Sequence, residues 1–376
     1  MTSWFIFETL TGTQLQQFDP QSGSCSVRVN EAEEIEVTVP LTDPDLAALD
    51  WRSLASPWKA SIAVEEHGRF YGGPILPHDF NSDSYELKLT ARGIWTYFDH
   101  RFILPPAART TPLVNAAGLP NTSLDTNISG FDLGTIAKKL VQQACAWPGA
   151  NLPIVYQADR SGFRSRKYSA LDVKTVGSGL TDITNVNNGP DIRFQLRRRD
   201  SLHFEWLMET GTEAQPRLQS STIPQWDLAA DQSSGSGLDV TTDPSRMADV
   251  SWATGGRNTD RTFVSLRQNT RLRDAGYPLL ETLDSTHSEV EVQSTLDDYA
   301  SEALRTAYVP AQFWSFKARV EAAPFLSEYA PGDPCFIHIE DNPYLQDGTY
   351  TRRIAALSFD EQGEWITITL GEVYDG

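Results

Sequence analysis

The chain has 376 residues, and its 31 Lys and Arg against 50 Asp and Glu give a formal net charge of -19. Because binding along duplex nucleic acid requires basic side chains that neutralise phosphates, this charge argues against a protein that holds nucleic acid over its whole surface. Ordinary contents of Gly (25) and Pro (22) exclude collagen-like and low-complexity chains, and the length predicts two or three domains.

The first 92 residues are predicted to form about seven short β-strands. The clearest two, 24–29 and 34–39, alternate apolar and polar residues with the period of a half-buried strand. Turns are expected at His67-Gly68 and at 81–84. A meander that closes into a small barrel, or a sandwich, would remove exposed sheet edges. The other predicted strands are 4–9, 13–18, 58–66, 69–80 and 85–92.

Three later segments have the signals of amphipathic helices. Each begins with a triplet that resembles a capping box: Ser129-x-x-Asp132, Ser169-x-x-Asp172 and Thr295-x-x-Asp298. Apolar residues follow at helical spacing, and such faces pack against a core far more often than they bind a ligand. The faces are Ile136, Leu140, Val141 and Ala144; then Val173, Val176, Leu180 and Ile183; then Leu296, Tyr299, Ala300, Ala303, Leu304 and Ala307.

More strands are predicted between and after these helices. Residues 191–198 and 202–209 have the pattern of a hairpin around Asp200-Ser201. Residues 232–237 are predicted to form a loop, and 247–253 with 261–268 a second strand pair. The C-terminal part returns to β structure, with strands predicted at 312–321, 335–340, 350–359 and 364–370.

A weak internal repeat links the two ends of the chain. The segment with Ile75 and Phe80, followed by the alternating strand 85–90, has an echo in Ile354 and Phe359 followed by 364–369. Each is a strand, a short polar turn and an alternating strand. The repeat predicts two copies of one barrel, with the helices between them.

The sequence contains no recognisable catalytic, cofactor or metal motif. Three cysteines far apart (Cys25, Cys145 and Cys335) form neither a disulfide framework nor a zinc site, and we expect buried thiols. The six histidines are never paired at metal-ligand spacing. Neither a signal peptide nor an apolar run long enough to cross a membrane is present, so we expect synthesis in the cytosol and no membrane insertion. We expect no enzymatic activity.

Two basic clusters stand out against the acidic background. They are Arg160, Arg164, Arg166 and Lys167 with Arg197-Arg198-Arg199, and Arg257, Arg261, Arg267, Arg271 and Arg273. We predict that these side chains pair with carboxylates, within or between subunits. Carboxylate pairs such as Glu65-Glu66 leave a glycoside hydrolase or a soluble carbohydrate-binding β-protein as an alternative, although solvated surface charge explains them better.

This order of elements resembles the tail hub (baseplate hub) proteins of long-tailed bacteriophages, often labelled minor tail proteins in phages of actinobacteria. The likeness covers nearly the whole chain. It is carried by 85–101, where a strand runs into a short helix, by the helix 296–308 with Tyr329-Ala330-Pro331-Gly332-Asp333-Pro334 after it, and by 348–354 before the final hairpin.

The resemblance implies a mainly β protein with some α structure (α+β), built from two tail-tube-like antiparallel β-barrels and an interleaved insertion domain with helices. It places the first barrel at 1–104, the insertion at 105–187 and 215–308, and the second barrel at 188–214 and 309–376. Because the chain stops at Gly376, after the last strand, any lytic activity is expected in another protein.

The resemblance also implies a homotrimer at the tail tip of the virion, assembled in the host cytoplasm. Three chains with two barrels each would form a pseudo-sixfold ring. Its neighbours would be a distal tail protein or tail-tube ring above and a fibre, spike or central tip protein below, with the tape-measure protein and DNA passing through the lumen. Ring contacts are expected at Trp4, Trp58 and Trp314, each equally plausible as a core residue, and at Arg261, Arg267, Arg271 and Arg273.

Two further expectations concern charge and symmetry. Carboxylates that line the lumen would repel the DNA phosphates, so that the genome slides through without being held. The alternative within the same machine is a hexameric distal tail or baseplate protein that contacts carbohydrate.

Overall fold

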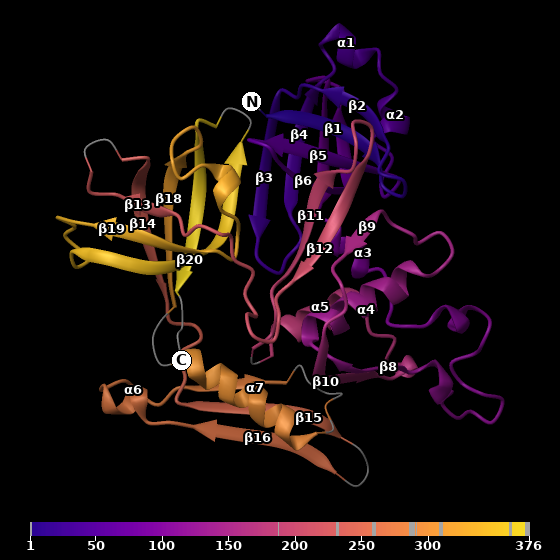
Figure 1. The fold of residues 1–376 in the computed structure, drawn as a ribbon, viewed down its shortest axis with the longest axis vertical. Helices are drawn as coiled ribbons and strands as arrows, with labels where there is room; N and C mark the ends of the chain where they lie inside the picture. Colours follow the sequence, from indigo (N-terminus) through magenta and orange to yellow (C-terminus); the bar gives the residue numbers. More distant parts are fainter. Residues whose placement is uncertain are drawn as a thin grey trace.

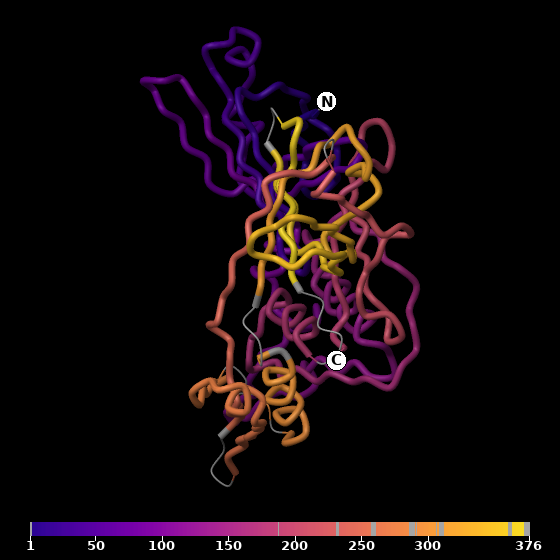
Figure 2. The backbone as a smooth tube through the Cα atoms, turned by 90° about the vertical axis from the view of Figure 1, so that its left-hand side faces the viewer, coloured from indigo at the N-terminus to yellow at the C-terminus, as the bar shows by residue number. Residues whose placement is uncertain are grey.

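The computed structural model describes residues 2–186, 188–230, 233–257, 261–285, 290, 292–307, 311–360 and 363–372. The protein is mainly β with few helices, in agreement with the predicted class. Figure 1 shows an N-terminal sheet and a C-terminal sheet standing side by side, with a group of helices and a small α/β unit beneath them. Figure 2 shows the small unit at the lower end of the molecule, away from both sheets.

All seven strands predicted in the first 92 residues are confirmed. They pair in the order β2-β1-β5-β6-β7-β4-β3, entirely antiparallel, so the expected simple meander is wrong: β1 pairs with β5, across two short helices that the sequence did not predict. The bounds are β1 Ser3–Glu8, β2 Gln14–Phe18, β3 Ser22–Arg28, β4 Glu34–Pro40, α1 Pro44–Ala47, α2 Trp51–Leu54, β5 Ala60–Glu66, β6 Arg69–Asn81 and β7 Glu86–Arg92.

This sheet folds over a single apolar core. Alternate residues of β3, β4 and β7 are buried, as their period-two pattern requires. The Trp4 indole of β1 packs against β3 so closely that a Cβ added to Gly23 would lie 2.3 Å from its Cζ2 atom. No pairing within the described residues joins β2 to β3, so a barrel closed by hydrogen bonds remains a prediction.

The helical layer comes from residues 95–184. The buried face predicted for the first helix is confirmed, but the helix begins after Asp132, whose carboxylate accepts a bond from Thr135 N at 2.7 Å. The second helix begins after Thr175, and Val173 is exposed in the preceding turn, so its predicted place on the buried face is wrong. The elements are α3 Trp95–Phe98, η1 Pro106–Arg109, η2 Thr122–Leu124, β8 Thr126–Phe131, α4 Leu133–Cys145, β9 Ile154–Tyr156, β10 Ser161–Tyr168, η3 Ala170–Asp172 and α5 Val176–Thr184.

The predicted hairpin forms from β11 Ile192–Arg198 and β12 Phe204–Thr210. It belongs beside the N-terminal sheet, because Leu196 pairs with Phe70 of β6 and β12 pairs with β9. Its inward side chains, including Phe194 and Trp206, share a core with α4 and α5. Placing 188–214 in the second barrel was therefore wrong.

The C-terminal sheet has the order β14-β18-β21-β20-β19-β13. Its four C-terminal strands are confirmed. The sequence missed β13 and β14, which it placed in the insertion domain and partly in a loop at 232–237. The bounds are β13 Gln225–Asp227, β14 Gly235–Asp243, β18 Ala311–Arg319, η4 Leu326–Glu328, β19 Pro334–Ile339, β20 Gly348–Asp360 and β21 Trp365–Glu372.

The small α/β unit packs the third predicted helix onto a three-stranded sheet of order β16-β15-β17 (Figure 1). Leu296 and Ala300 of the helix contact Ala253 of β15, as the predicted apolar face requires. Thr295 lies inside the helix and does not cap it. The bounds are β15 Val250–Arg257, β16 Thr262–Gln268, α6 Arg271–Asp274, β17 Glu281–Asp284 and α7 Gln293–Thr306.

The two large sheets are joined at a single strand pair, in which β20 runs antiparallel to β3. Beside this pair, Asp191 lies before β11 and forms an ion pair with Arg353 of β20, and it accepts bonds from Asn30 Nδ2 (3.3 Å) and Leu218 N (2.9 Å). Arg353 also donates from Nε to Gly332 O at 2.9 Å. A carboxylate with few contacts to water thus connects both sheets and the hairpin.

Replacing Arg353 tests this connection. Arg353→Ala leaves Asp191 buried without its charge partner, so we expect the free energy of unfolding to fall by about 3 kcal/mol. Arg28→Ala is the control, because Arg28 and Glu31 form an exposed pair at 3.9 Å and its loss is expected to cost about 0.5 kcal/mol or less. Denaturant unfolding measures both variants, and equal losses would contradict a linking role for Arg353.

Candidate assembly surface

The internal repeat is confirmed in its pairing register. In β6 and β7, Ile75 pairs with Ala91 and, after a bulge, His78 pairs with Leu89. In β20 and β21, Ile354 pairs with Leu370 and, after a bulge, Leu357 pairs with Ile368. Every equivalent pair is separated by the same offset in sequence. Both long strands therefore bend at the same place, pairing with the preceding strand before the bulge and with the following strand after it.

The same offset extends to the strands on the far side. Val37 of β4 pairs with Leu89, and Phe316 of β18 pairs with Ile368. The series β3-β4-β7-β6 is thus equivalent to β14-β18-β21-β20. Because β20 also pairs with β3, the two series form one continuous run of eight strands, with β14 at one end and the second half of β6 at the other.

One face of this run is apolar and covered by the core, and the opposite face is polar. Thr367, Ser358, Ser26 and Glu34 lie in a row across four neighbouring strands. Other Ser and Thr residues in outward register are Ser22, Ser24, Thr38, Thr90, Thr241, Ser315 and Thr369.

Charges on the polar face are mixed in sign. Arg92 and Glu34 lie opposite each other on neighbouring strands and form an ion pair at 3.0 Å. Acids and bases occur there in nearly equal number, so the chain's acidic excess is not gathered on this face. The charged residues in outward register are Arg28, Glu34, Glu36, Asp79, Glu86, Lys88, Arg92, Asp239, Asp243, Lys317 and Arg319.

The two ends of the run leave strand edges without partners among the described residues. Residues 77–85 of the β6–β7 hairpin are all exposed, and the hairpin projects from the body of the molecule (Figure 2). Phe80 is 55% exposed, whereas its equivalent Phe359, in the internal junction, is 5% exposed. At the other end, the outer edge of β14 is unpaired and Val240 is half-buried.

A second exposed surface lies on the small α/β unit. On the side of its sheet away from α7, Trp252 pairs directly with Leu266 and Leu283. All three side chains are exposed, as is Val264 on the same face. Sheet faces of this composition are normally covered, so this surface is available for contact with another chain.

The predicted interface tryptophans are placed differently from one another. Trp4 and Trp314 are buried in the core, so their expected role in ring contacts is wrong: side chains enclosed by their own chain present no surface to a neighbour. Trp58 is 37% exposed. Its ring packs edge-on against His100, with 4.9 Å between the ring centroids, and a contact with another subunit stays a prediction.

The predicted interface arginines also pair within the chain. Arg267 of β16 bonds to Asp297 of α7 at 2.8 Å, and Arg273 lies 3.4 Å from the buried carboxylate of Asp249. Arg261 and Arg271 are exposed. The side chain of Arg257, the other member of this cluster, lies outside the described residues. Pairing with carboxylates, one of the two uses predicted for this cluster, is therefore confirmed inside the subunit.

The first basic cluster is likewise used internally. Arg160 bonds to Asp132 at 2.5 Å and to the Gly211 carbonyl at 2.9 Å, which ties α4 to the end of β12. Arg198 lies over the Phe204 ring, 4.5 Å from its centroid. These contacts stabilise the subunit and leave no basic groove for nucleic acid in this part of the described chain.

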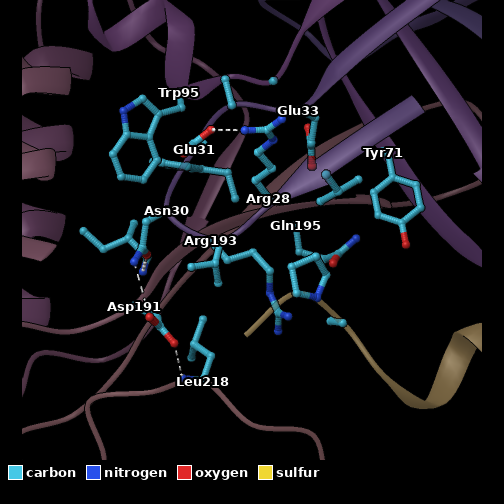
Figure 3. Close-up of a pocket in the computed structure, with 18 of the residues that line it drawn as sticks. Arg28, Asn30, Glu31, Glu33, Tyr71, Trp95, Asp191, Arg193, Gln195 and Leu218 are labelled. Carbon is cyan, nitrogen blue, oxygen red and sulfur yellow. Dashed lines mark hydrogen bonds and ion pairs between the residues drawn. The ribbon is translucent and has the colours of Figure 1, made fainter. Parts of the chain in front are cut away.

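A small cavity of about 40 Å³ lies where the N-terminal sheet meets the hairpin and the C-terminal half (Figure 3). Figure 3 shows Glu33 beside Tyr71, and Asp191 bonded to Asn30 and Leu218. Burial raises the pKa of Glu33 to about 8, while a bond from Gly72 N at 3.4 Å and the charge of Arg193 oppose this rise. Sequence reasoning missed Glu33 because its tertiary burial leaves no local pattern.

The described residues offer little for chemistry. A cavity of this size has space for about one water molecule and excludes a substrate. The structure brings together no group of three His, Cys, Asp or Glu side chains that could hold a metal, as far as the described chain goes. None of the described helices is long and apolar enough to cross a membrane. Cys25, Cys145 and Cys335 are all buried as free thiols.

Comparison of the whole fold with solved structures finds tail proteins. The 43 kDa tail protein of prophage MuSo2 from Shewanella oneidensis is 11% identical with a TM-score of 0.56, covering 99% of this chain and 98% of that one. A tail protein from Neisseria meningitidis MC58 is 14% identical with a TM-score of 0.56, covering 99% and 96%. Prophage tail protein gp18 from Listeria monocytogenes EGD-e is 11% identical with a TM-score of 0.50, covering 100% and 95%. No family model and no curated sequence matches the chain.

Glu33 gives stability a defined dependence on pH. The unfolded chain releases the Glu33 proton near pH 4.5 and the folded chain near pH 8. The free energy of unfolding therefore falls as pH rises through this window. We expect Glu33→Gln to be more stable than the parent at pH 8.5 by roughly 2 kcal/mol, with a much smaller difference at pH 4. Urea unfolding across this range measures the difference, with the exposed Glu36→Gln as control. The same slope in Glu33→Gln and in the parent would contradict the assignment.

Proposed function

We propose that this protein, which has the fold of phage tail proteins over its whole length, is a structural subunit of a bacteriophage tail. We further propose that it forms the tail-tip hub as a homotrimer. The observation that carries the proposal is the internal repeat, in which one chain contains two equivalent four-stranded series in identical register. Three such chains would present six equivalent series.

Symmetry explains why a repeat of this kind suits a hub. A ring of six equivalent series can mate with a sixfold tail tube above it, while the chain itself repeats only three times and can hold a threefold fibre, spike or central tip protein below. In a hexamer of this chain the ring would present twelve series, which does not match a sixfold tube. The repeat therefore favours the trimer over a hexameric distal tail protein.

The polar face of the eight-stranded run is the surface we assign to the channel. Its Ser and Thr hydroxyls, and charges of both signs such as the Arg92–Glu34 pair, present no continuous basic track to DNA. The genome and the tape-measure protein would pass without being held, because neutralising many phosphates requires uncompensated cations. This replaces the expected carboxylate lining with a nearly neutral hydroxylated one.

A structural role also accounts for what the described residues contain. The buried carboxylates, including Asp191 and Asp249, accept bonds that hold segments of the chain together. We propose that the protein has no catalytic activity and no cofactor, and that it acts in the virion at the tail tip.

Native mass measurement tests this proposal. The protein, alone and after incubation with tails that lack it, should run as a species of three times 41.8 kDa or be incorporated as three copies per particle. Six copies would favour the distal tail alternative. A monomer that binds or hydrolyses cell-wall carbohydrate, and that is absent from particles, would overturn the proposal.

A further inference from the structure

We propose that neighbouring copies of the chain join by strand addition, in which the second half of β6 (77–81) of one copy pairs antiparallel with the outer edge of β14 (239–243) of the next. This inference rests on the proposed function in taking the assembly to be a ring. It adds the strands, the register and the faces that form the contact.

The template is the junction inside the chain. There β20 pairs with β3 so that Leu357 lies opposite Val27, Ser358 opposite Ser26 and Phe359 opposite Cys25. By the repeat, 77–81 of β6 is equivalent to 356–360 of β20, which supplies one side of that junction.

The other side of the junction is equivalent to β14. Cys25 of β3 pairs with Ile35, and Val240 of β14 pairs with Trp314. Ile35 and Trp314 are themselves equivalent, because they pair with Ala91 and Leu370. The register between copies then follows: Pro77 opposite Asp243, His78 opposite Thr242, Asp79 opposite Thr241, Phe80 opposite Val240 and Asn81 opposite Asp239.

The backbone of β6 is compatible with this register. In the internal junction, Val29 N donates to Ala355 O at 3.3 Å. Because hydrogen-bonded and non-hydrogen-bonded pairs alternate along antiparallel strands, Ala356 occupies a position that gives no bond to β3. Its equivalent is Pro77, which has no N–H to give. The proline therefore removes nothing that the pairing between copies needs, and His78 and Phe80 keep their N–H groups directed at β14.

Side chains on the core side are complementary. In the internal junction Phe359 and Cys25 are both buried. In the proposed junction their equivalents are Phe80, which is exposed in the single chain, and Val240, which is half-buried against the core. An aromatic side chain opposite a β-branched one is a favourable cross-strand pair, and the neighbour would cover Phe80 as β3 covers Phe359.

Topology requires a second copy as the occupant of each edge. The two edges lie at opposite ends of the eight-stranded run, and neighbouring strands are about 4.8 Å apart. The edges therefore cannot pair within one chain. A contact between two different edges is heterologous, and it ends without free edges only when the copies close into a ring.

Engineered disulfides test the register. Asp79→Cys with Thr241→Cys places two thiols at a non-hydrogen-bonded pair, where Cβ atoms are close enough for a disulfide. The matched control is Ser26→Cys with Ser358→Cys, the equivalent pair inside the chain. Under mild oxidation, in purified protein and in assembled tails, we expect the first variant to give covalent dimers and trimers that stop at three chains. The control should lose its thiols without a change in mass on a denaturing gel.

The outcomes separate this inference from the proposed function. A trimer in which Asp79→Cys/Thr241→Cys stays uncrosslinked, while the control pair forms its disulfide, would overturn the strand pairing and leave the trimer standing. Covalent polymers without a limit would also overturn it, since they show an open contact. A protein that never forms trimers, alone or in tails, would overturn the proposed function itself.

A substitution at Phe80 supplies an independent readout. Phe80→Asp is expected to abolish the trimer at concentrations where the parent is trimeric, because it places a carboxylate in the covered position, while the thermal midpoint of the monomer stays unchanged. The control is Phe163→Asp, at an aromatic residue that is 105% exposed on β10, away from both edges. Equal effects of both substitutions on assembly would contradict the contact.

Discussion

The pairing of β20 with β3 is the interaction on which the rest of the structure depends. It joins two equivalent strand series into one sheet, brings both apolar faces onto a shared core and aligns both polar faces on the opposite side. The ion pair between Asp191 and Arg353 lies beside this junction and ties in the hairpin that supports the helices. Without the junction, the chain would hold two separate sheets, each with an extra edge exposed to solvent.

The same constraint explains the two surfaces that the single chain leaves uncovered. A sheet that is complete at its centre still has two ends, and proteins usually blunt such ends with charges, prolines or short strands. Here the β6 end carries Phe80 and a proline placed where no N–H is needed, and the β14 end carries a half-buried Val240. These features fit pairing better than protection. The net charge of -19 lies elsewhere than on the polar face, where Arg92 offsets Glu34 and Ser and Thr predominate.

Much of the fold could be predicted from the sequence, and what was missed has physical reasons. Strands with strict alternation, such as β3, β4 and β21, were found because each has one buried face. β14 was missed because its Gly-, Ser- and Thr-rich sequence has no such pattern and gains its conformation from pairing with β18. The hairpin β11–β12 was found but misplaced, since alternation does not specify a neighbour. Trp4 and Trp314 could not be divided between core and interface by residue type. The constant offset of the repeat emerged only when pairing partners could be compared, although Ile75 and Ile354 already marked it.

The most direct test is an electron cryo-microscopy reconstruction of the tail tip at a resolution that separates β-strands. The account predicts three copies of the chain whose eight-stranded runs form one uninterrupted ring of strands, with β6 of each copy beside β14 of the next and the polar face toward the channel. Three copies whose β6 and β14 edges face solvent, or a ring whose channel is lined by the helices, would contradict it.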